Sequence, residues 1–162
     1  MRFYMKQKFM SIRQNFDIYN EQGDVVYQVR GKFPILRRKL SIIEPHHHQV
    51  LAEVNQALTL FFARVSVKVG GRPVAKIQQK LSFFGNKFGV TGLGWTVEGV
   101  SWLTGCAIYD KHHHPVARIQ AKVLAWSDTF EIEILDETVN PVLVLAVALA
   151  IDLANDRRQK SN

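Results

Sequence analysis

The chain is built from six copies of one unit. Two of its heptapeptides, VAKIQQK at residues 74–80 and VARIQAK at residues 116–122, are nearly identical, and they belong to a longer repeat with a spacing of 20 to 25 residues. The residues three places before and eight places after each anchor position are all apolar. The six anchor positions are Lys8, Lys32, Ala57, Lys80, Val100 and Lys122. A repeat of this period indicates one supersecondary unit that has been copied in tandem.

Each unit has the pattern of two β-strands. Apolar or small side chains alternate with polar ones, as with Tyr27 and Val29 in the second unit and Ala75 and Ile77 in the fourth. This alternation is typical of a strand with one buried face. Turn residues and a second alternating run follow in the units. Six units therefore predict about twelve antiparallel strands over residues 3–135, and a sheet of that size must close or split to avoid exposed edges.

A different segment follows the repeats. The run PVLVLAVALAIDLA, which begins at Pro141, is apolar on all sides, and Asn140 before it is a suitable helix N-cap. We predict a helix over residues 141–156, and such a helix must be buried. Its dozen apolar residues are fewer than the roughly 20 that span a bilayer. The predicted fold is all-β with one core helix: a closed barrel of about twelve strands, too wide for its own side chains to fill, around a buried C-terminal helix.

Composition indicates one globular domain over residues 1–162, because 47% of the residues are hydrophobic and no Pro, Gly or Ser-rich linker divides the chain. The formal net charge of +7 favours polyanionic partners, whether nucleic acid, anionic lipid or acidic protein. The segment MRFYMKQKFM lacks the apolar run of a signal peptide, and the single Cys106 has no internal disulfide partner. We therefore expect a cytoplasmic protein, either free or at the periphery of a membrane.

The chain resembles the LURP-one-related family of bacterial and plant proteins. The resemblance is carried by KQKF at 6–9, VYQVRGKF at 26–33, WSDTFEIEI at 126–134 and AIDLA at 150–154. That family is similar to the tubby C-terminal superfamily, which includes the phospholipid scramblases. The resemblance implies a tubby-like barrel with a central helix and brings no catalytic motif.

Two scramblase features can be compared with this sequence. The scramblase calcium segment precedes the C-terminal helix, and its only counterparts here are Asp128 and Asp136, which makes a calcium site doubtful. The cysteine-rich lipidation segment has no counterpart, because Cys106 stands alone.

A meander brings the turns within the units to one end of the barrel. That end collects basic side chains, and each lysine or arginine near an anionic membrane contributes roughly 1 kcal/mol. The predicted anion-binding residues are Arg13, Arg37, Arg38, Lys39, Arg64 and Lys87. The resemblance to tubby proteins, which bind phosphoinositides, supports this prediction. The alternative is a solvated rim whose charges discourage aggregation.

Two triple-histidine tracts occupy turns between units. Alternate imidazoles, such as His46 with His48 and His112 with His114, can bind zinc or a similar ion weakly. The two units lie three steps apart in a six-unit barrel, so the tracts cannot share one ion. We interpret them as solvated turn residues and predict no metal ion or other cofactor.

Catalytic chemistry has little support in the sequence. Cys106 has no histidine or carboxylate at an informative spacing, and Asp152, on an apolar helix, needs a partner or a raised pKa. We expect a non-catalytic binding or scaffold module that recognises an anionic lipid headgroup or a partner protein. Two alternatives stay open: an enzyme that uses Asp152 or the histidines, and nonspecific binding of nucleic acid.

Overall fold

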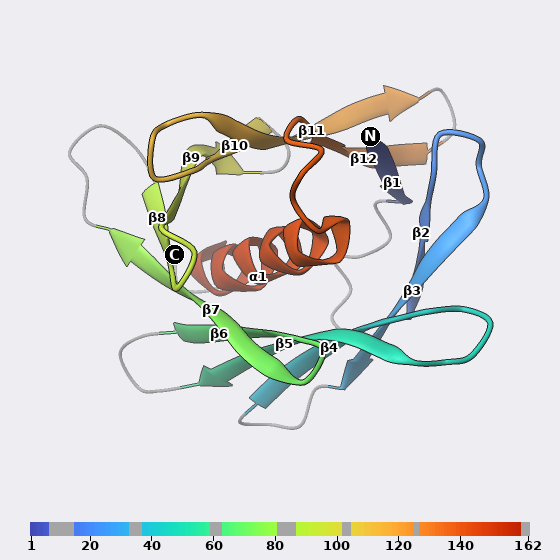
Figure 1. Cartoon of the computed structure of the whole chain (residues 1–162), viewed down its shortest axis with the longest axis horizontal. Coiled ribbons are helices and arrows are strands. Elements are labelled where there is room, and N and C mark those ends of the chain that lie inside the picture. Colours follow the sequence, from blue (N-terminus) through green and yellow to red (C-terminus); the bar gives the residue numbers. More distant parts are fainter. Residues whose placement is uncertain are drawn as a thin grey trace.

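The computed structural model describes residues 1–6, 15–32, 37–58, 63–80, 87–101, 105–124 and 127–159. In this part of the chain, twelve antiparallel strands form a closed barrel around one helix (Figure 1). The strands are β1 (Arg2–Lys6), β2 (Phe16–Tyr19), β3 (Val25–Lys32), β4 (Arg37–Ile43), β5 (Val50–Leu58), β6 (Ala63–Val69), β7 (Arg72–Lys80), β8 (Lys87–Thr91), β9 (Trp95–Ser101), β10 (Gly105–Tyr109), β11 (Pro115–Leu124) and β12 (Ser127–Ile134). The helix is α1 (Pro141–Gln159).

The barrel is a simple meander. Each strand pairs with its neighbours in the sequence, and β1 closes the ring by pairing with β12. The predicted closed barrel of about twelve strands around a C-terminal helix is therefore confirmed. Residues three places before an anchor, such as Val29, Val54 and Ile77, are buried, as the repeat predicts.

The helix is the centre of the core. The side chain of Asn140 caps it by accepting the backbone N–H of Val142 at 2.9 Å. Every side chain from Val144 to Ile151 is buried, in agreement with the predicted core helix. It ends at Gln159, three residues beyond the predicted end. Within the described residues, no helix combines the length and the apolar character needed to cross a bilayer.

Side-chain size on the barrel wall sets the position of the helix. α1 packs most closely against β5 and β6, whose inward residues include small ones such as Ala52 and Val67. Strands farther from the helix carry bulkier buried side chains: Phe3, Met5, Phe88, Trp95 and Phe130. These bulky side chains fill the space between the helix and the strands that it approaches less closely, which gives the dense packing typical of protein interiors.

One buried polar side chain joins the wall to the helix. Gln56 on β5 is 1% exposed, and its Nε2 donates a hydrogen bond to the carbonyl oxygen of Leu153 at 2.8 Å. This bond connects the C-terminal half of α1 to β5 in the barrel wall.

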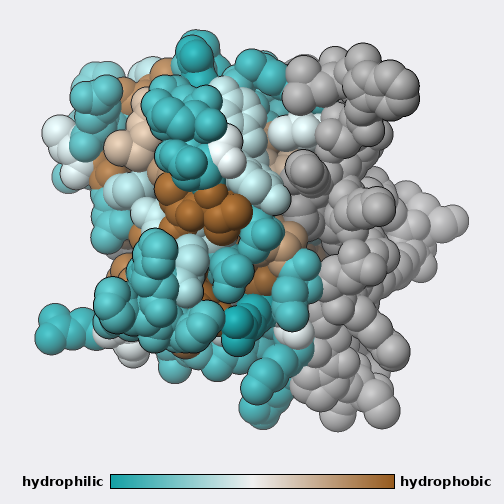
Figure 2. Space-filling model, turned by 90° about the vertical axis from the view of Figure 1, so that its right-hand side faces the viewer, coloured by the Kyte–Doolittle hydropathy of each residue, from teal (hydrophilic) through white to brown (hydrophobic). Residues whose placement is uncertain are grey.

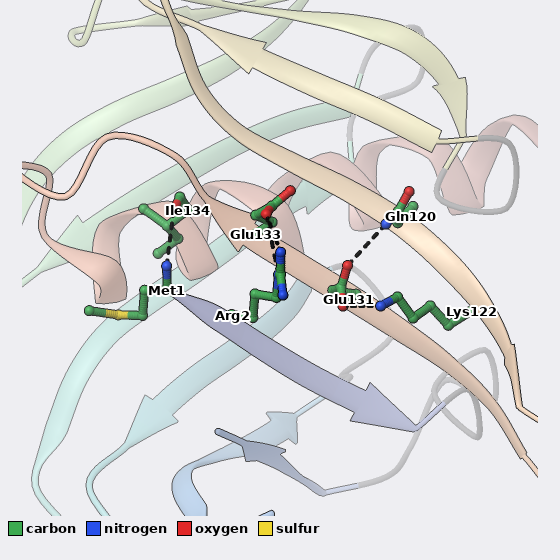
Figure 3. A network of polar contacts seen from close by, with 7 residues as sticks. All are labelled: Met1, Arg2, Gln120, Lys122, Glu131, Glu133 and Ile134. Carbon is green, nitrogen blue, oxygen red and sulfur yellow. Dashed lines mark hydrogen bonds and ion pairs between the residues drawn. The ribbon is translucent and has the colours of Figure 1, made fainter. Parts of the chain in front are cut away.

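A polar network covers the closure between β1 and β12 (Figure 3). The N-terminal ammonium of Met1 donates to the carbonyl oxygen of Ile134 at 3.3 Å, and Arg2 pairs with Glu133 at 2.8 Å. Nearby, Glu131 is 2% exposed although it faces outward. Its Oε1 accepts a hydrogen bond from Gln120 at 2.9 Å.

The second carboxylate oxygen of Glu131, Oε2, is ion-paired with Lys122. Burial, the largest influence, raises the pKa of Glu131, but the contacts with Lys122, Gln120 and Tyr4 together outweigh it, so its pKa lies below the usual value. The ionised carboxylate therefore stabilises the folded state above the unfolded pKa, and this contribution is lost as the pH falls through the folded pKa.

We expect Lys122→Met to lower the free energy of unfolding at pH 7 by about 1 to 2 kcal/mol, because it leaves a buried carboxylate without its cation. The loss is this small because the Lys122 side chain is 41% exposed, and solvent screens its charge. At a pH below the pKa of Glu131 the carboxyl is neutral, and the loss should shrink. Urea denaturation at pH 7 and at an acidic pH that protonates Glu131 in the folded protein measures the loss in each state, with Lys111→Met as the control. An equal loss at the two pH values would contradict the role of this pair.

Candidate functional site

A basic groove crosses the outer wall of the barrel over β3 to β7. Its volume is about 740 Å³. The residues that alternate with most of its lining, such as Val54, Val67 and Ala75, are buried inside the barrel, so most of the groove lies on the outer face. Gln56, Val65 and Ile77 also line it but are buried. Its basic lining residues are Lys32, Arg37, Arg38, Lys39, Arg64, Lys68 and Lys76, and Glu53 is the acidic residue among the described lining.

The strand register explains the shape of the groove. One row runs directly across five strands through Lys32, Lys39, Asn55, Ser66 and Lys76. The two short side chains lie in the middle of this row and long basic side chains lie at its ends, so the surface is lower at the centre. With about 4.8 Å between strands, the Lys39 and Lys76 backbones lie about 14 Å apart.

A second row of residues repeats this arrangement of a small side chain between long basic ones. Arg37 on β4 lies opposite Ala57 on β5, which lies opposite Arg64 on β6. The small alanine again separates two long cations, so four basic residues in two rows surround a floor of small side chains. An anionic group of modest size fits this arrangement, because arginine and lysine can both donate to phosphate oxygens.

Glu53 interrupts the positive charge of the groove. Its carboxylate forms an ion pair with the ammonium of Lys39, and in the register it lies directly opposite Lys68. The side chains of Lys39 and Glu53 are 40% and 25% exposed, so the pair is accessible from solvent.

The structure brings four of the predicted anion-binding residues together, namely Arg37, Arg38, Lys39 and Arg64. Arg13 lies outside the described residues, and of Lys87 only the backbone, at the start of β8, is described. Lys32, Lys68 and Lys76 also line the groove and were not among the predicted residues. Lys68 lies on β6, the strand of Arg64, and Lys76 lies opposite Ser66 of that strand, so a register between units could have identified both.

The histidine tracts lie in the turns that follow β4 and β10. The Glu44 carboxylate accepts the backbone N–H groups of His46 and His47 at 2.9 and 2.6 Å. In the other turn, the Asp110 carboxylate accepts the backbone N–H groups of His112 and His114, both at 2.8 Å. These hydrogen bonds lower the pKa of both carboxyl groups. The carboxylates thus shape the turns.

The imidazoles themselves are open to solvent. The side chains of His47 and His114 are 87% and 78% exposed, and His46, His48 and His112 are exposed as well. In the strand order, β4 and β10 lie on opposite sides of the ring, which keeps the two tracts apart. Over the described residues, no three His, Cys, Asp or Glu side chains are grouped to hold a metal ion.

The two scramblase-like acidic positions are also separated. Asp128 lies at the beginning of β12, and Asp136 follows the end of that strand. The carboxylate of Asp136 accepts hydrogen bonds from the backbone and hydroxyl of Thr138 at 3.0 and 2.6 Å, which shapes the turn before the helix. A strand of this length keeps the two positions about 20 Å apart.

The interior thiol is unsuited to nucleophilic chemistry. Cys106 on β10 is buried, and burial raises its pKa to about 12, with a further contribution from the negative charge of Asp152. A thiol with this pKa is protonated at neutral pH, and the thiolate is the reactive form of cysteine. Asp152 is half-buried on the helix nearby.

Large apolar side chains are few on the described surface. Figure 2 shows the side of the barrel that faces right in Figure 1, where hydrophilic residues surround an apolar patch. Among the described residues, the exposed large hydrophobic side chains are Met1, Val25 and Val50. Charge is therefore the stronger basis for a binding site on this surface.

Comparison with known proteins places the barrel in a family. Residues 1–152 match the family model described as LURP-one-related. The chain belongs to the LURP-one-related family. The uncharacterised protein YxjI of Bacillus subtilis strain 168 is 27% identical over 153 residues, which cover 94% of this chain and 93% of that protein. No solved structure matches the chain significantly. The LURP-one-related match includes all the strands that form the basic groove, so the groove lies within the matched region.

Proposed function

We propose that this LURP-one-related protein is a non-catalytic binding module whose basic groove holds the phosphate-bearing headgroup of an anionic lipid. The observation that carries the proposal is the cross-strand register, which sets Lys39, Lys76, Arg37 and Arg64 around a floor of Asn55, Ser66 and Ala57. Among the described lining residues, seven are basic and one is acidic. A phosphate group is the natural complement to such a site, because it offers several charged acceptor oxygens.

Electrostatic attraction to the membrane sets the expected binding free energy. Each lysine or arginine close to an anionic surface contributes about 1 kcal/mol, so four to seven of them in one place are enough for reversible binding. A lipid surface is preferred over single-stranded nucleic acid, because no aromatic side chain is among the described lining residues and base stacking needs such platforms.

The candidate catalytic residues support a non-catalytic role. Asp152 lies eleven residues beyond the start of α1 at Pro141, which is about 16 Å along the helix axis. The histidine tracts lie in turns at the end of the barrel from which the helix starts. Asp152 and the imidazoles are thus held at different depths of the barrel, and the thiol near Asp152 is protonated at neutral pH.

Vesicle binding by charge-neutralised variants tests the proposal. A triple variant, Arg37→Gln, Lys39→Gln and Arg64→Gln, should bind phosphatidylcholine vesicles that contain phosphatidic acid at least tenfold more weakly than the wild type. The matched control removes three exposed cations outside the strands of the groove: Arg2→Gln, Lys111→Gln and Arg118→Gln. It should lose less than about threefold, because these residues act only through screened, long-range attraction.

The outcomes separate the alternatives. Equal losses in the two triple variants would show attraction by net charge alone and contradict a groove. If vesicles do not bind but a short DNA duplex does, and the groove variant loses that binding, nucleic acid replaces lipid as the ligand class. Rising salt concentration should weaken either form of binding.

A further inference from the structure

We propose that Glu53 sets the selectivity of the basic groove. In this inference, which rests on the proposed function, an anionic headgroup must displace the Glu53 carboxylate from Lys39 before it can use that lysine. The Glu53 carboxylate then repels a phosphomonoester, which carries more negative charge, more strongly than it repels a singly charged phosphodiester. Glu53 is then a specificity-determining residue within the groove.

Repulsion between the lysines of the groove explains why a carboxylate lies among them. Lys32 and Lys39 lie directly opposite each other across β3 and β4, and like charges in this relation destabilise a sheet. Glu53 lies diagonally from Lys39, with which it is ion-paired, and directly opposite Lys68 on its other side. One carboxylate therefore offsets the repulsion among several lysines while the groove is unoccupied.

A bound anion changes this balance. When a phosphate takes Lys39, Glu53 loses its partner and also faces the negative charge of the ligand. The cost of losing that partner is the same for every ligand. The repulsion from Glu53, like the attraction to the basic residues, grows with the charge of the ligand, which is one for a phosphodiester and about 1.5 to 2 for a phosphomonoester at pH 7. Selectivity is a difference between affinities, so Glu53 reduces the preference that the basic residues alone would give to phosphomonoesters.

The Glu53→Gln variant tests the inference, because glutamine keeps the size of the side chain and removes its charge. Two sets of phosphatidylcholine vesicles are used, one with phosphatidylglycerol and one with phosphatidic acid, at matched total charge. The wild type should prefer phosphatidic acid. In the variant, binding to phosphatidic acid vesicles should rise about fivefold and binding to phosphatidylglycerol vesicles about twofold, so that the preference widens.

Glu133→Gln is the matched control. Glu133 lies on β12, has a similar exposure of 21%, and is paired with Arg2, so its replacement makes the same change in net charge far from the groove. It should leave the ratio of the two affinities unchanged.

Each outcome decides between the two proposals. If the wild type binds both kinds of vesicle no better than pure phosphatidylcholine, the proposed function fails and the inference fails with it. If the wild type binds but Glu53→Gln raises both affinities by the same factor, or changes neither, the inference alone is overturned.

Discussion

Replacement of Leu145 by alanine is expected to lower the free energy of unfolding by about 3 to 4 kcal/mol, close to the upper part of the range for buried leucines. Leu145 is fully buried in the first half of α1, with strands on all sides of the helix. A closed sheet cannot collapse easily into the space that a shortened side chain leaves, so most of the cavity should persist.

Urea denaturation followed by circular dichroism measures this loss. Leu143→Ala is the matched control, because Leu143 lies on the same helix but is only half-buried. It should cost about 1 to 2 kcal/mol. If Leu145→Ala cost no more than the control, the helix would not be the packed centre of the barrel.

The second large effect concerns Gly99 on β9. Its φ angle is +120°, a conformation that residues with a Cβ rarely adopt, and an added Cβ would lie 2.6 Å from the carbonyl oxygen of Gly105 and 2.7 Å from the Cα of Cys106. Both contacts are with the backbone of the neighbouring strand, at the point where the β9–β10 register shifts. Gly99→Ala must therefore push two paired strands apart.

We expect Gly99→Ala to lower the free energy of unfolding by about 3 kcal/mol, from backbone strain and the steric clash together. Gly23 offers the matched control, because its φ angle is +87° but nothing lies within 4 Å of an added Cβ. Gly23→Ala should cost only about 1 to 2 kcal/mol. Thermal or urea unfolding of the two variants gives the comparison, and equal losses would show that the close approach of β10 has no energetic effect.

The fold could be predicted because it depends on local and repeated patterns. Alternation along each unit fixes which residues face inward, and the six copies fix the number of strands. Burial of Val29, Val54 and Ile77 follows from their place in the repeat, and the all-round apolar run after Pro141 predicts a core helix. A closed meander is then the arrangement that leaves no edge strand.

The groove could not be predicted in the same way, because it depends on register between strands. Asn55, Ser66 and Lys76 are far apart in the sequence pattern and meet only through the pairing of β5 with β6 and of β6 with β7. A shift of one residue would turn each of these side chains to the other face of the sheet. The sequence therefore identified Arg37, Lys39 and Arg64 as basic residues near one end, but not the floor between them or the ion pair of Glu53.

An NMR titration tests the central claim most directly, because it locates the ligand on the barrel. Soluble, short-chain phosphatidic acid is added to the isotope-labelled protein, and the backbone amide signals are followed. We expect the signals of Lys39, Asn55, Ser66 and Lys76 to shift together and saturably, while those of Arg2 and Glu133 on the opposite wall stay in place. Shifts centred on the histidine turns or on β12, or no saturable shift over the groove, would contradict a phosphate-binding site on β3 to β7.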